Sequence, residues 1–392
     1  MTEKVLVVGS PHASSTRDVF MGVLKGLSQN NVSVQSYDVF PRGEFFANFI
    51  AWFKAEKIQV NMLREIPSPM LLAYEPVFIA AHHYEVDTVV FVSPQYLPMD
   101  IPRMLKKDGF KVIGIFTESP YEDHIDAVQK AEFFDYCFVS DLNSEAYWRP
   151  FNPNTFYLPH SYDPDKHFPW WDAPAHKKRY DIHNGHQHVG YVGSGFSRRQ
   201  KYLEEMVQSE AWGPDIDLKL FGYWPFLMPT KNKDDMVRGP DGNEINRDEY
   251  FEGMIPREPS VLAPYTRAAM VDNAFTARIY RGLAIGINIH RTERWNNNAD
   301  ILIDEGEAYS MGPRGVELAA CGAFQISDFR QEIVDVFGDT VPLHSSPEDL
   351  GRLIRKYLND PAERERLARL QHEAIKGRTF KNSMGRVLEL AA

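Results

Sequence analysis

Short apolar runs separated by stretches long enough for helices are the feature that most constrains how this chain can fold. Six of these runs in the first 158 residues have the length and composition of strands. They are VLVVG, VSVQSYDV, DTVVFVS, KVIGIF, YCFVS and TFYLP, beginning at Val5, Val32, Asp87, Lys111, Tyr136 and Thr155. Continuous rather than alternating apolar runs are typical of parallel strands that helices cover on both faces. The first part of the chain therefore predicts a Rossmann-like α/β domain.

Length and composition indicate two domains and disfavour several classes of protein. A chain of 392 residues is too long for one ordinary core. Its formal net charge of −11 provides no global positive field that would gather nucleic acid. The start MTEKVLVVGS lacks the features of a signal peptide, and no apolar run approaches the ~20 residues of a membrane span. We expect a cytoplasmic protein without a transmembrane segment, in which Cys137 and Cys321 are buried reduced thiols.

Motifs for dinucleotide cofactors and metal ions are weak in this sequence. The turn after the first strand, GSPHASSTRD, lacks the G-x-G-x-x-G fingerprint, which disfavours an oxidoreductase. His183, His186 and His188 have a spacing that could hold a metal, but they lie in a polar connection before a strand. Asp163-Pro-Asp165 and Asp215-Ile-Asp217 each spell D-x-D, and a turn and a strand start explain them better. We therefore expect no bound metal.

Residues 311–329, MGPRGVELAACGAFQISDF, predict a helix with a cation at its amino end, followed by a buried strand. Pro313 opens this helix and Gly322 closes it. Arg314 lies in the first turn, where the helix dipole disfavours a positive charge, and Glu317 lies on the same face. Either the two side chains form an ion pair on a solvated face, or both face a bound anion together with the free backbone amides.

A second helix with cations at its amino end is predicted in VGYVGSGFSRRQKYLEEMV. The strand ends at Gly193, and the Ser-Gly turn that follows lets the backbone approach a ligand closely. Arg198 and Arg199 lie in the first turn of the next helix. Two such helix starts beside a sheet are expected where amide-rich helix ends and guanidinium groups hold a diphosphate. The alternative is that both arginines are exposed and pair with Glu204 or Glu205.

The rest of the second half adds a strand-end site, a long excursion and a last strand. GLAIGINIHR predicts a strand with His290 and Arg291 at its carboxyl end, where open α/β sheets bind ligands. A purely structural role for His290 is the alternative. The polar excursion over residues 225–264 is too long for an ordinary connection, so it is a functional flap, an oligomer contact or a mobile loop. TVPLHSS, from Thr340, predicts the last strand.

The run PRGVELAACGAFQISDFRQEIVDVFGD resembles the donor-binding signature of GT-B-fold glycosyltransferases, specifically the group 1 transferases and their CgeB-like (spore maturation protein) branch. This resemblance implies an α/β fold of GT-B architecture, with two Rossmann-like domains facing across a cleft. It implies an amino-terminal acceptor domain over residues 1–165, a linker over 166–187 and a carboxyl-terminal donor domain over 188–376. Residues 377–392 would form a helix that packs back on the first domain.

The resemblance also implies transfer of a sugar from a UDP- or GDP-sugar, without a metal or other cofactor and with retention of configuration. In that family the first turn of the signature helix meets the diphosphate, a Glu matching Glu317 binds the ribose, and a glycine matching Gly222 lies under the base. The donor-binding residues that we expect are Gly193, Ser194, Arg198, Arg199, Gly222, His290, Arg291, Arg314, Gly315 and Glu317. The sequence departs from the family at Tyr309, where many members carry a second Glu that touches the sugar.

The acceptor is expected to bind strand-end loops of the first half, which carry Ser93, Gln95 and Tyr121. Glu118 or His124 in these loops could remove the proton of the attacking hydroxyl, and a structural role for each is the alternative. CgeB-like proteins suggest a polysaccharide or glycan acceptor or, with less support from the net charge, a hydroxymethylated base in phage DNA. A GT-B-fold sugar-nucleotide epimerase and a non-catalytic nucleotide-sugar binding protein are the other classes. The sequence leaves the oligomeric state open, and a homo-oligomer is one alternative.

Overall fold

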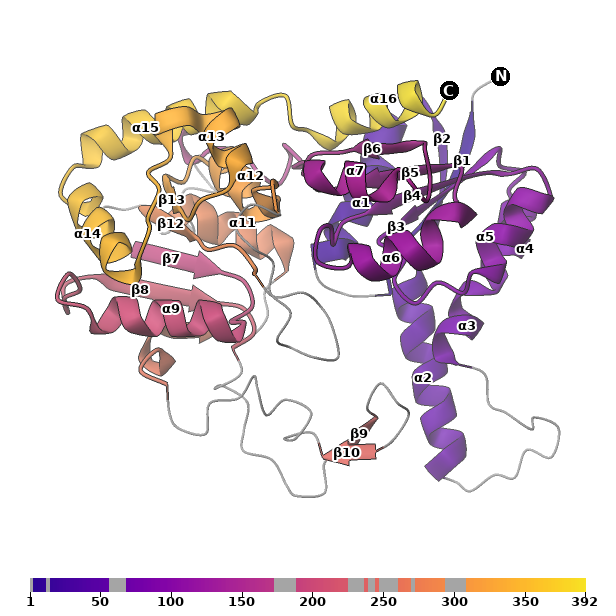
Figure 1. Ribbon diagram of the computed structural model, residues 1–392, viewed down its shortest axis with the longest axis horizontal. Helices are drawn as coiled ribbons and strands as arrows, with labels where there is room; N and C mark the ends of the chain where they lie inside the picture. The colour runs from indigo at the N-terminus through magenta and orange to yellow at the C-terminus, as the bar shows by residue number, and fades with distance from the viewer. Residues whose placement is uncertain are drawn as a thin grey trace. The chain divides into compact units, whose positions relative to one another are not determined.

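The computed structural model divides into two compact units, each built around its own parallel sheet (Figure 1). Unit 1 comprises residues 1–161 and 378–392, and unit 2 comprises residues 162–377. The structure describes residues 3–11, 15–55, 68–172, 188–224, 236–238, 244–246, 260–268, 272–292 and 308–392. None of the helices in these ranges is long and apolar enough to cross a membrane.

Unit 1 holds a six-stranded parallel sheet in the order β2-β1-β3-β4-β5-β6. Its strands are β1 Lys4–Val8, β2 Ser33–Tyr37, β3 Thr88–Val92, β4 Lys111–Phe116, β5 Tyr136–Val139 and β6 Thr155–Tyr157. Its helices are α1 Ser15–Gln29, α2 Val39–Ala55, α3 Pro69–Tyr74, α4 Pro76–His83, α5 Asp100–Lys107, α6 Asp123–Lys130, α7 Leu142–Trp148 and α16 Phe380–Leu390, with a 3-10 turn η1 at Ala131–Phe133. The strands coincide closely with the six apolar runs of the sequence.

The apolar runs of unit 1 are continuous because both faces of the sheet are covered. Val5 and Val7 pack in a core with Leu27 of α1, whereas Leu6 and Val8 pack in a separate core on the other face. Successive side chains of a strand point to opposite faces, so a strand buried on both faces needs apolar residues at every position.

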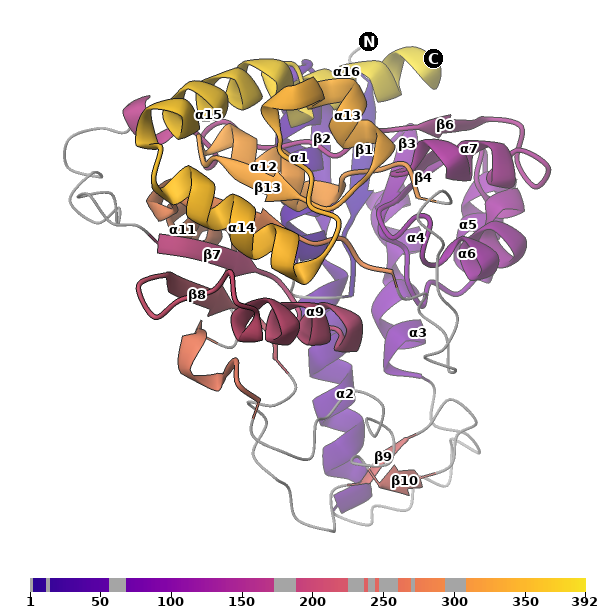
Figure 2. The same cartoon turned by 60° about the vertical axis from the view of Figure 1, so that its left-hand side comes forward.

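Helix α16 at the carboxyl end of the chain packs against α1 (Figure 1; Figure 2). A Cβ at Gly26 would lie 2.4 Å from the carbonyl oxygen of Phe380, so the two backbones approach closely at this point. The side-chain amide of Asn30 donates to the carbonyl oxygen of Lys381 at 2.8 Å, and the hydroxyls of Ser161 and Ser383 are 2.6 Å apart. The last helix is therefore fastened to unit 1 by backbone packing and polar contacts.

Unit 2 holds a five-stranded parallel sheet in the order β11-β8-β7-β12-β13. Its strands are β7 His188–Val192, β8 Asp217–Phe221, β11 Thr266–Ala268, β12 Ile285–Asn288 and β13 Gln325–Ser327. Its helices are α9 Ser197–Gln208, α11 Asn273–Gly282, α12 Gly312–Ala320, α13 Gln331–Phe337, α14 Pro347–Leu358 and α15 Pro361–Ile375, with 3-10 turns η2 Trp170–Asp172, η4 Ala263–Tyr265 and η5 Gly338–Thr340. A separate antiparallel pair joins β9 Met236–Arg238 and β10 Glu244–Asn246.

The two parallel sheets confirm the predicted α/β class with two Rossmann-like folds. Cys137 and Cys321 are buried free thiols, as predicted. The strand predicted at TVPLHSS is wrong. Only one isolated bridge, between Ser327 and Leu343, pairs this segment with the sheet. Pro342 has no amide hydrogen for a ladder, although its carbonyl oxygen accepts the amide hydrogen of Ser327. Most of the predicted excursion over residues 225–264 lies outside the described residues.

Candidate functional site

Two glycine turns meet at the carboxyl ends of β7 and β8. Gly193 and Gly222 have φ angles of +148° and +115°, which residues with a side chain rarely adopt. A Cβ at Gly222 would lie 2.4 Å from the carbonyl oxygen of Gly193, so the two turns stack backbone on backbone. A Cβ at Gly195 would lie 2.2 Å from the ring of Trp224, which is buried. The Gly-Ser-Gly turn is thus closely packed against the turn at Gly222 and the ring of Trp224.

Arg314, in the first turn of α12, reaches across to the ends of two strands. Its Nε donates to the carbonyl oxygen of Val192 at 2.7 Å. Its Nη1 donates to Asn288 Oδ1 and to the carbonyl oxygen of Ile289, each at 3.1 Å, and its Nη2 donates to the hydroxyl of Tyr191 at 2.9 Å. All four partners are neutral, and Arg314 forms no ion pair with any residue that the structure describes. The ion pair with Glu317 on a solvated face is therefore the wrong alternative.

Two further guanidinium groups lie near this strand end. The Cζ of Arg199 is 5.3 Å from the ring centroid of Tyr191 and 5.4 Å from that of Phe196, and its Nη1 donates to the carbonyl oxygen of Ser194 at 2.6 Å. The Cζ of Arg291 lies 5.1 Å from the ring centroid of Phe196. Arg199 is buried, so the exposed alternative fails for this residue, whereas Arg198 is exposed.

The N-cap residues of α9, α12 and α13 provide no side-chain cap, unlike those of three other helices of unit 2. Asp272, Ser346 and Asp360 cap α11, α14 and α15 through their side chains. Phe196 and Met311 occupy the equivalent positions before α9 and α12 and provide no such cap. At the start of α12, the amide of Gly312 donates to Ser310 Oγ at 3.2 Å, and Pro313 has no amide hydrogen.

His290 ties the end of β12 to β13 and to the start of α12. The backbone amide of His290 donates to Asp328 Oδ2 at 2.9 Å, its Nδ1 contacts Asp328 Oδ1, and its Nε2 lies 2.9 Å from the carbonyl oxygen of Met311. Burial alone would raise the pKa of Asp328, but the charge and hydrogen bond of His290 outweigh it and hold that pKa well below its usual range. Protein partners thus engage the backbone amide and both ring nitrogens of His290, which is the structural role.

Residues that sequence reasoning missed complete the start of α12. Glu332 is buried and its Oε2 accepts the amide hydrogen of Met311 at 2.8 Å. Like His290, Asp328 lies just after a strand of the same sheet. This position at a strand end is the sequence signal that could have identified it. Tyr191 is buried inside β7 and reads as an ordinary core residue in the sequence. Its contact with Arg314 spans 123 positions, which no local pattern reveals.

Glu317 and Gly315 both lie on α12, and Gly315 is more buried than Glu317. Glu317 is partly buried, and its Oε1 lies 3.9 Å from Nε2 of His167, a residue that the sequence analysis did not single out. Burial lowers the pKa of His167 to about 4, so this imidazole is neutral near pH 7. Gly315 is buried, and its carbonyl oxygen accepts from Gln325 Nε2 at 2.9 Å. Tyr309, at the position of the family's second Glu, donates its hydroxyl hydrogen to Asp335 Oδ2 at 3.0 Å.

In unit 1, the predicted acceptor residues lie at the carboxyl ends of β3 and β4. Ser93 has a φ angle of +48°, and its hydroxyl is 2.5 Å from that of Thr117. The amide of Gln95 donates to both carboxylate oxygens of Glu122 at 3.0 Å. These two contacts join the loops after β3 and β4. The other predicted residues follow β4 and are half-buried; they are Glu118, Tyr121 and His124.

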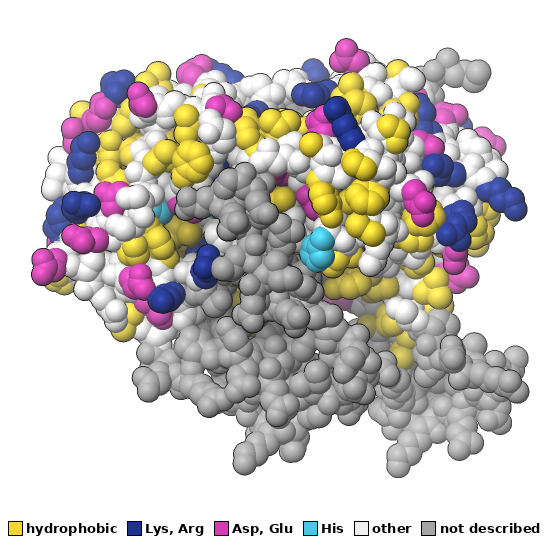
Figure 3. All heavy atoms as spheres, in the orientation of Figure 1, with side chains coloured by type: hydrophobic (Ala, Val, Ile, Leu, Met, Phe, Trp, Pro, Cys, Tyr) yellow, Lys and Arg dark blue, Asp and Glu magenta, His cyan; other side chains and the backbone are white. Residues whose placement is uncertain are grey.

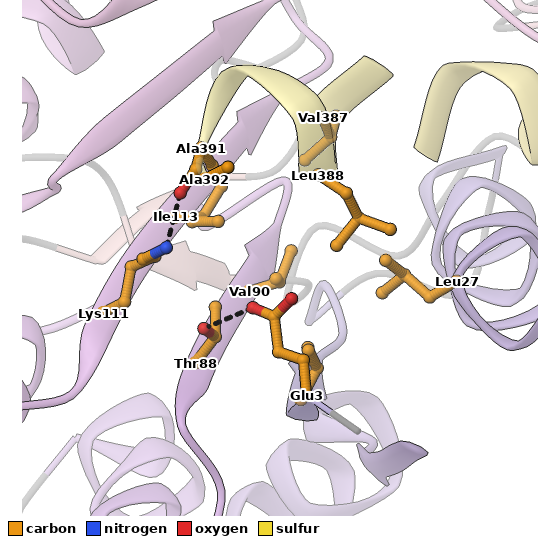
Figure 4. Close-up of a pocket in the computed structure, with 11 residues that line it drawn as sticks. Glu3, Leu27, Thr88, Val90, Lys111, Ile113, Val387, Leu388, Ala391 and Ala392 are labelled. Atoms are coloured by element: carbon orange, nitrogen blue, oxygen red, sulfur yellow. Dashed lines mark hydrogen bonds between the residues drawn. The ribbon is translucent and has the colours of Figure 1, made fainter. Parts of the chain in front are cut away.

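The cavity in Figure 4 lies at the opposite, amino-terminal ends of the unit 1 strands. It measures about 60 Å³ and is lined mainly by aliphatic side chains of the sheet, α1 and α16. Its polar groups are engaged, since Thr88 donates to Glu3 at 3.0 Å and Lys111 donates to the carbonyl oxygen of Ala391. The cavity therefore does not coincide with the strand-end residues that the sequence predicts for binding.

The part of the chain that the structure describes contains no group of three or more His, Cys, Asp or Glu side chains placed to hold a metal. His183 and His186 lie outside the described residues. His188 pairs with Asp217 at 2.5 Å, and Asp215 pairs with Arg355 at 3.2 Å, so the second D-x-D motif is engaged in ion pairs. On the described part of the face in Figure 3, acidic and basic side chains are interspersed.

Comparisons with known proteins bear on the fold of the chain and on its carboxyl-terminal half. Residues 198–389 match a family model described as glycosyl transferase-like. The structure of Anabaena HepE in complex with UDP-glucose has a TM-score of 0.61 at 10% identity, covering 98% of this chain and 99% of that chain. An alpha-glucosyltransferase in complex with UDP and a 13-mer DNA containing a HMU base has a TM-score of 0.59 at 9% identity, with both chains fully covered.

A UDP-N-acetylglucosamine 2-epimerase structure has a TM-score of 0.53 at 10% identity, covering 99% of this chain and 95% of that chain. No curated protein matches the chain in sequence. At these identities the likeness of the structures establishes the fold, and the family model characterises the carboxyl-terminal half. The protein therefore has the GT-B fold, and its residues 198–389 match the glycosyl transferase-like family model.

Proposed function

We propose that this protein is a glycosyltransferase that moves a sugar from a UDP-sugar to a hydroxyl acceptor. The observation that carries the proposal is Arg314, a cation held at the carboxyl ends of β7 and β12 by four neutral oxygen atoms. Its charge is not neutralised by a described ion pair, and Arg199 and Arg291 lie nearby. When the sugar departs, charge develops on the diphosphate, and guanidinium groups aimed beforehand stabilise that charge.

UDP is the proposed nucleotide because HepE and the alpha-glucosyltransferase bind it. By the family resemblance, Glu317 would bind the ribose hydroxyls and Gly222 would lie under the base. Ser194, Arg198 and Gly315, near the starts of the two helices, are the other proposed phosphate contacts. Tyr309 is hydrogen-bonded to Asp335 and lacks the carboxylate of the family's second Glu, so we propose no sugar contact for it.

The proposed mechanism needs no metal, because the guanidinium groups would supply the positive charge at the diphosphate. Retention of configuration follows the resemblance to group 1 transferases. The acceptor would bind Ser93, Gln95 and Tyr121 in unit 1, and Glu118 or His124 would take the proton of its hydroxyl. Glu118 and His124 are both half-buried, so their burial supports either residue as the base.

The proposed acceptor is a glycan, and the CgeB-like branch is the proposed place of the chain among the transferases. The interspersed charges in Figure 3 and the net charge of −11 favour a neutral acceptor over DNA. The alpha-glucosyltransferase structure, which contains a DNA with a HMU base, keeps a hydroxymethylated base as the second acceptor to test.

Thermal stabilisation by UDP, GDP and their sugars tests the donor site. A ligand that binds only the folded protein raises its melting temperature according to the ratio of concentration to dissociation constant. We expect UDP and one or more UDP-sugars to stabilise the wild type, and Arg314→Ala and Glu317→Ala to abolish the shift. Arg366→Ala is the control, because Arg366 is exposed on α15 and pairs with Glu363. A wild type that no UDP compound stabilises would refute the donor assignment.

Turnover separates the proposed transferase from its alternatives. UDP release from a UDP-sugar that accelerates when an acceptor is added supports the transferase. A GT-B-fold epimerase would instead convert UDP-N-acetylglucosamine to its 2-epimer or hydrolyse it without an acceptor, a reaction suggested by the epimerase of similar fold. A binding protein would be stabilised by UDP-sugars and would turn over none of them.

A further inference from the structure

The hydroxyl and ring of Tyr191 contact the cations of the candidate donor site. The hydroxyl accepts a hydrogen bond from Nη2 of Arg314 at 2.9 Å. The ring centroid lies 4.4 Å from Cζ of Arg314 and 5.3 Å from Cζ of Arg199. One aromatic side chain therefore contacts two guanidinium groups.

Close packing around its ring and its hydroxyl holds Tyr191 in place. It is fully buried in β7, and its ring meets Trp224 edge to face at 5.8 Å between centroids. A Cβ at Gly193 would lie 3.0 Å from the hydroxyl of Tyr191 and 2.4 Å from Nη2 of Arg314. The glycine thus leaves the space in which the hydroxyl and the guanidinium group meet.

The chemistry of this contact preserves the charge of Arg314. A carboxylate at the same place would fix the guanidinium group and also neutralise it. A phenol hydroxyl accepts a hydrogen bond at neutral pH without carrying charge, and the electron-rich face of its ring attracts cations. Tyr191 can therefore orient the two cations without itself neutralising either charge.

We propose that Tyr191 is a positioning residue of the donor site, which holds Arg314 and Arg199 oriented for the β-phosphate of UDP. This inference rests on the proposed function, because it assumes that the arginines bind the donor diphosphate. Tyr191 acts through Arg314, so its contribution should depend on whether Arg314 is present. It should also matter more for a diphosphate than for a monophosphate ligand.

Calorimetric affinities of UDP and UMP for Tyr191→Phe test the proposal. This change removes the hydroxyl and keeps the ring, so we expect UDP to bind about tenfold more weakly, the cost of one charge-assisted hydrogen bond. UMP should bind with nearly unchanged affinity. The matched control is Tyr357→Phe, since Tyr357 is a buried tyrosine of the same unit that packs against Phe324.

A double-mutant cycle identifies the route of the effect. In the Arg314→Ala background, Tyr191→Phe should cause no further loss of UDP affinity. A further tenfold loss in that background would overturn the proposal, as would equal losses for UDP and UMP, which indicate a merely structural role. Wild-type affinity in Tyr191→Phe would also overturn it while leaving the donor site intact. Failure of the wild type to bind UDP would instead remove the proposed function itself.

Discussion

At the scale of single residues, the candidate site depends on a cation that the local sequence cannot explain. Arg314 stands at the end of a helix where the dipole opposes its charge, and this misplacement is visible in the sequence. Its partners are not visible, because Val192, Asn288 and Ile289 belong to strand ends more than twenty positions away. Sequence therefore identified the charge, and only the fold identifies what holds it.

Gly193 provides a test at the residue scale. Gly193→Ala would force a side chain to within 2.4 Å of Nη2 of Arg314, at a φ angle of +148°. We expect a loss of stability of about 1–3 kcal/mol from the strained backbone and at least tenfold weaker UDP binding. Melting temperature and calorimetric UDP affinity measure the two effects.

Gly377→Ala is the control for this substitution, because a Cβ there meets nothing within 4 Å. If Gly193→Ala binds UDP as the wild type does, the close approach of Arg314 to this turn does not contribute to the donor site.

At the scale of elements, the strands were predictable and the segment before unit 2's sheet was not. Strands buried on both faces leave continuous apolar runs, which is why the six strands of unit 1 could be recognised. The linker was expected over residues 166–187, and its described part, residues 166–172, belongs to unit 2. The amide of Trp170 donates to the carbonyl oxygen of Cys321 at 3.2 Å, and Trp171 meets His372 edge to face at 5.6 Å. Tryptophans among charged residues gave only a weak signal for this packing.

The packing of this segment predicts a pH dependence of stability through His167. Burial lowers the pKa of His167 to about 4 in the folded protein, against about 6.5 in an unfolded chain. The unfolded state therefore binds more protons between these values, so stability is lost as pH falls below about 6.5. From pH 7 to pH 5 this one group should cost about 2 kcal/mol of the free energy of unfolding.

Denaturant unfolding of wild type and His167→Gln at pH 7 and pH 5 measures this contribution. The variant should lose about 2 kcal/mol less than the wild type over that interval, because glutamine does not titrate. Equal losses in the two proteins would mean that His167 is not buried in its neutral form.

At the scale of the whole molecule, the fold could be predicted from the sequence and the acceptor could not. The GT-B fold extends over 98% of the chain in the comparison with HepE at only 10% identity, so the arrangement of strands persists where most side chains differ. Apolar patterning predicted the first Rossmann-like domain, and the resemblance to group 1 transferases implied the GT-B arrangement. The acceptor could not be reached in the same way, because the strand-end residues Ser93, Gln95 and Tyr121 suit many hydroxyl compounds.

The proposed function requires that guanidinium groups at the ends of β7 and β12 bind the diphosphate of a UDP-sugar. Calorimetric titration of wild type and Arg314→Ala with UDP and with uridine tests it most directly. We predict that the wild type binds UDP at least a hundredfold more tightly than uridine, from charge-assisted hydrogen bonds worth about 1.5–3 kcal/mol each. Arg314→Ala should lose most of this difference and keep its affinity for uridine. Equal binding of UDP and uridine by the wild type, or an unchanged UDP affinity in Arg314→Ala, would contradict the claim.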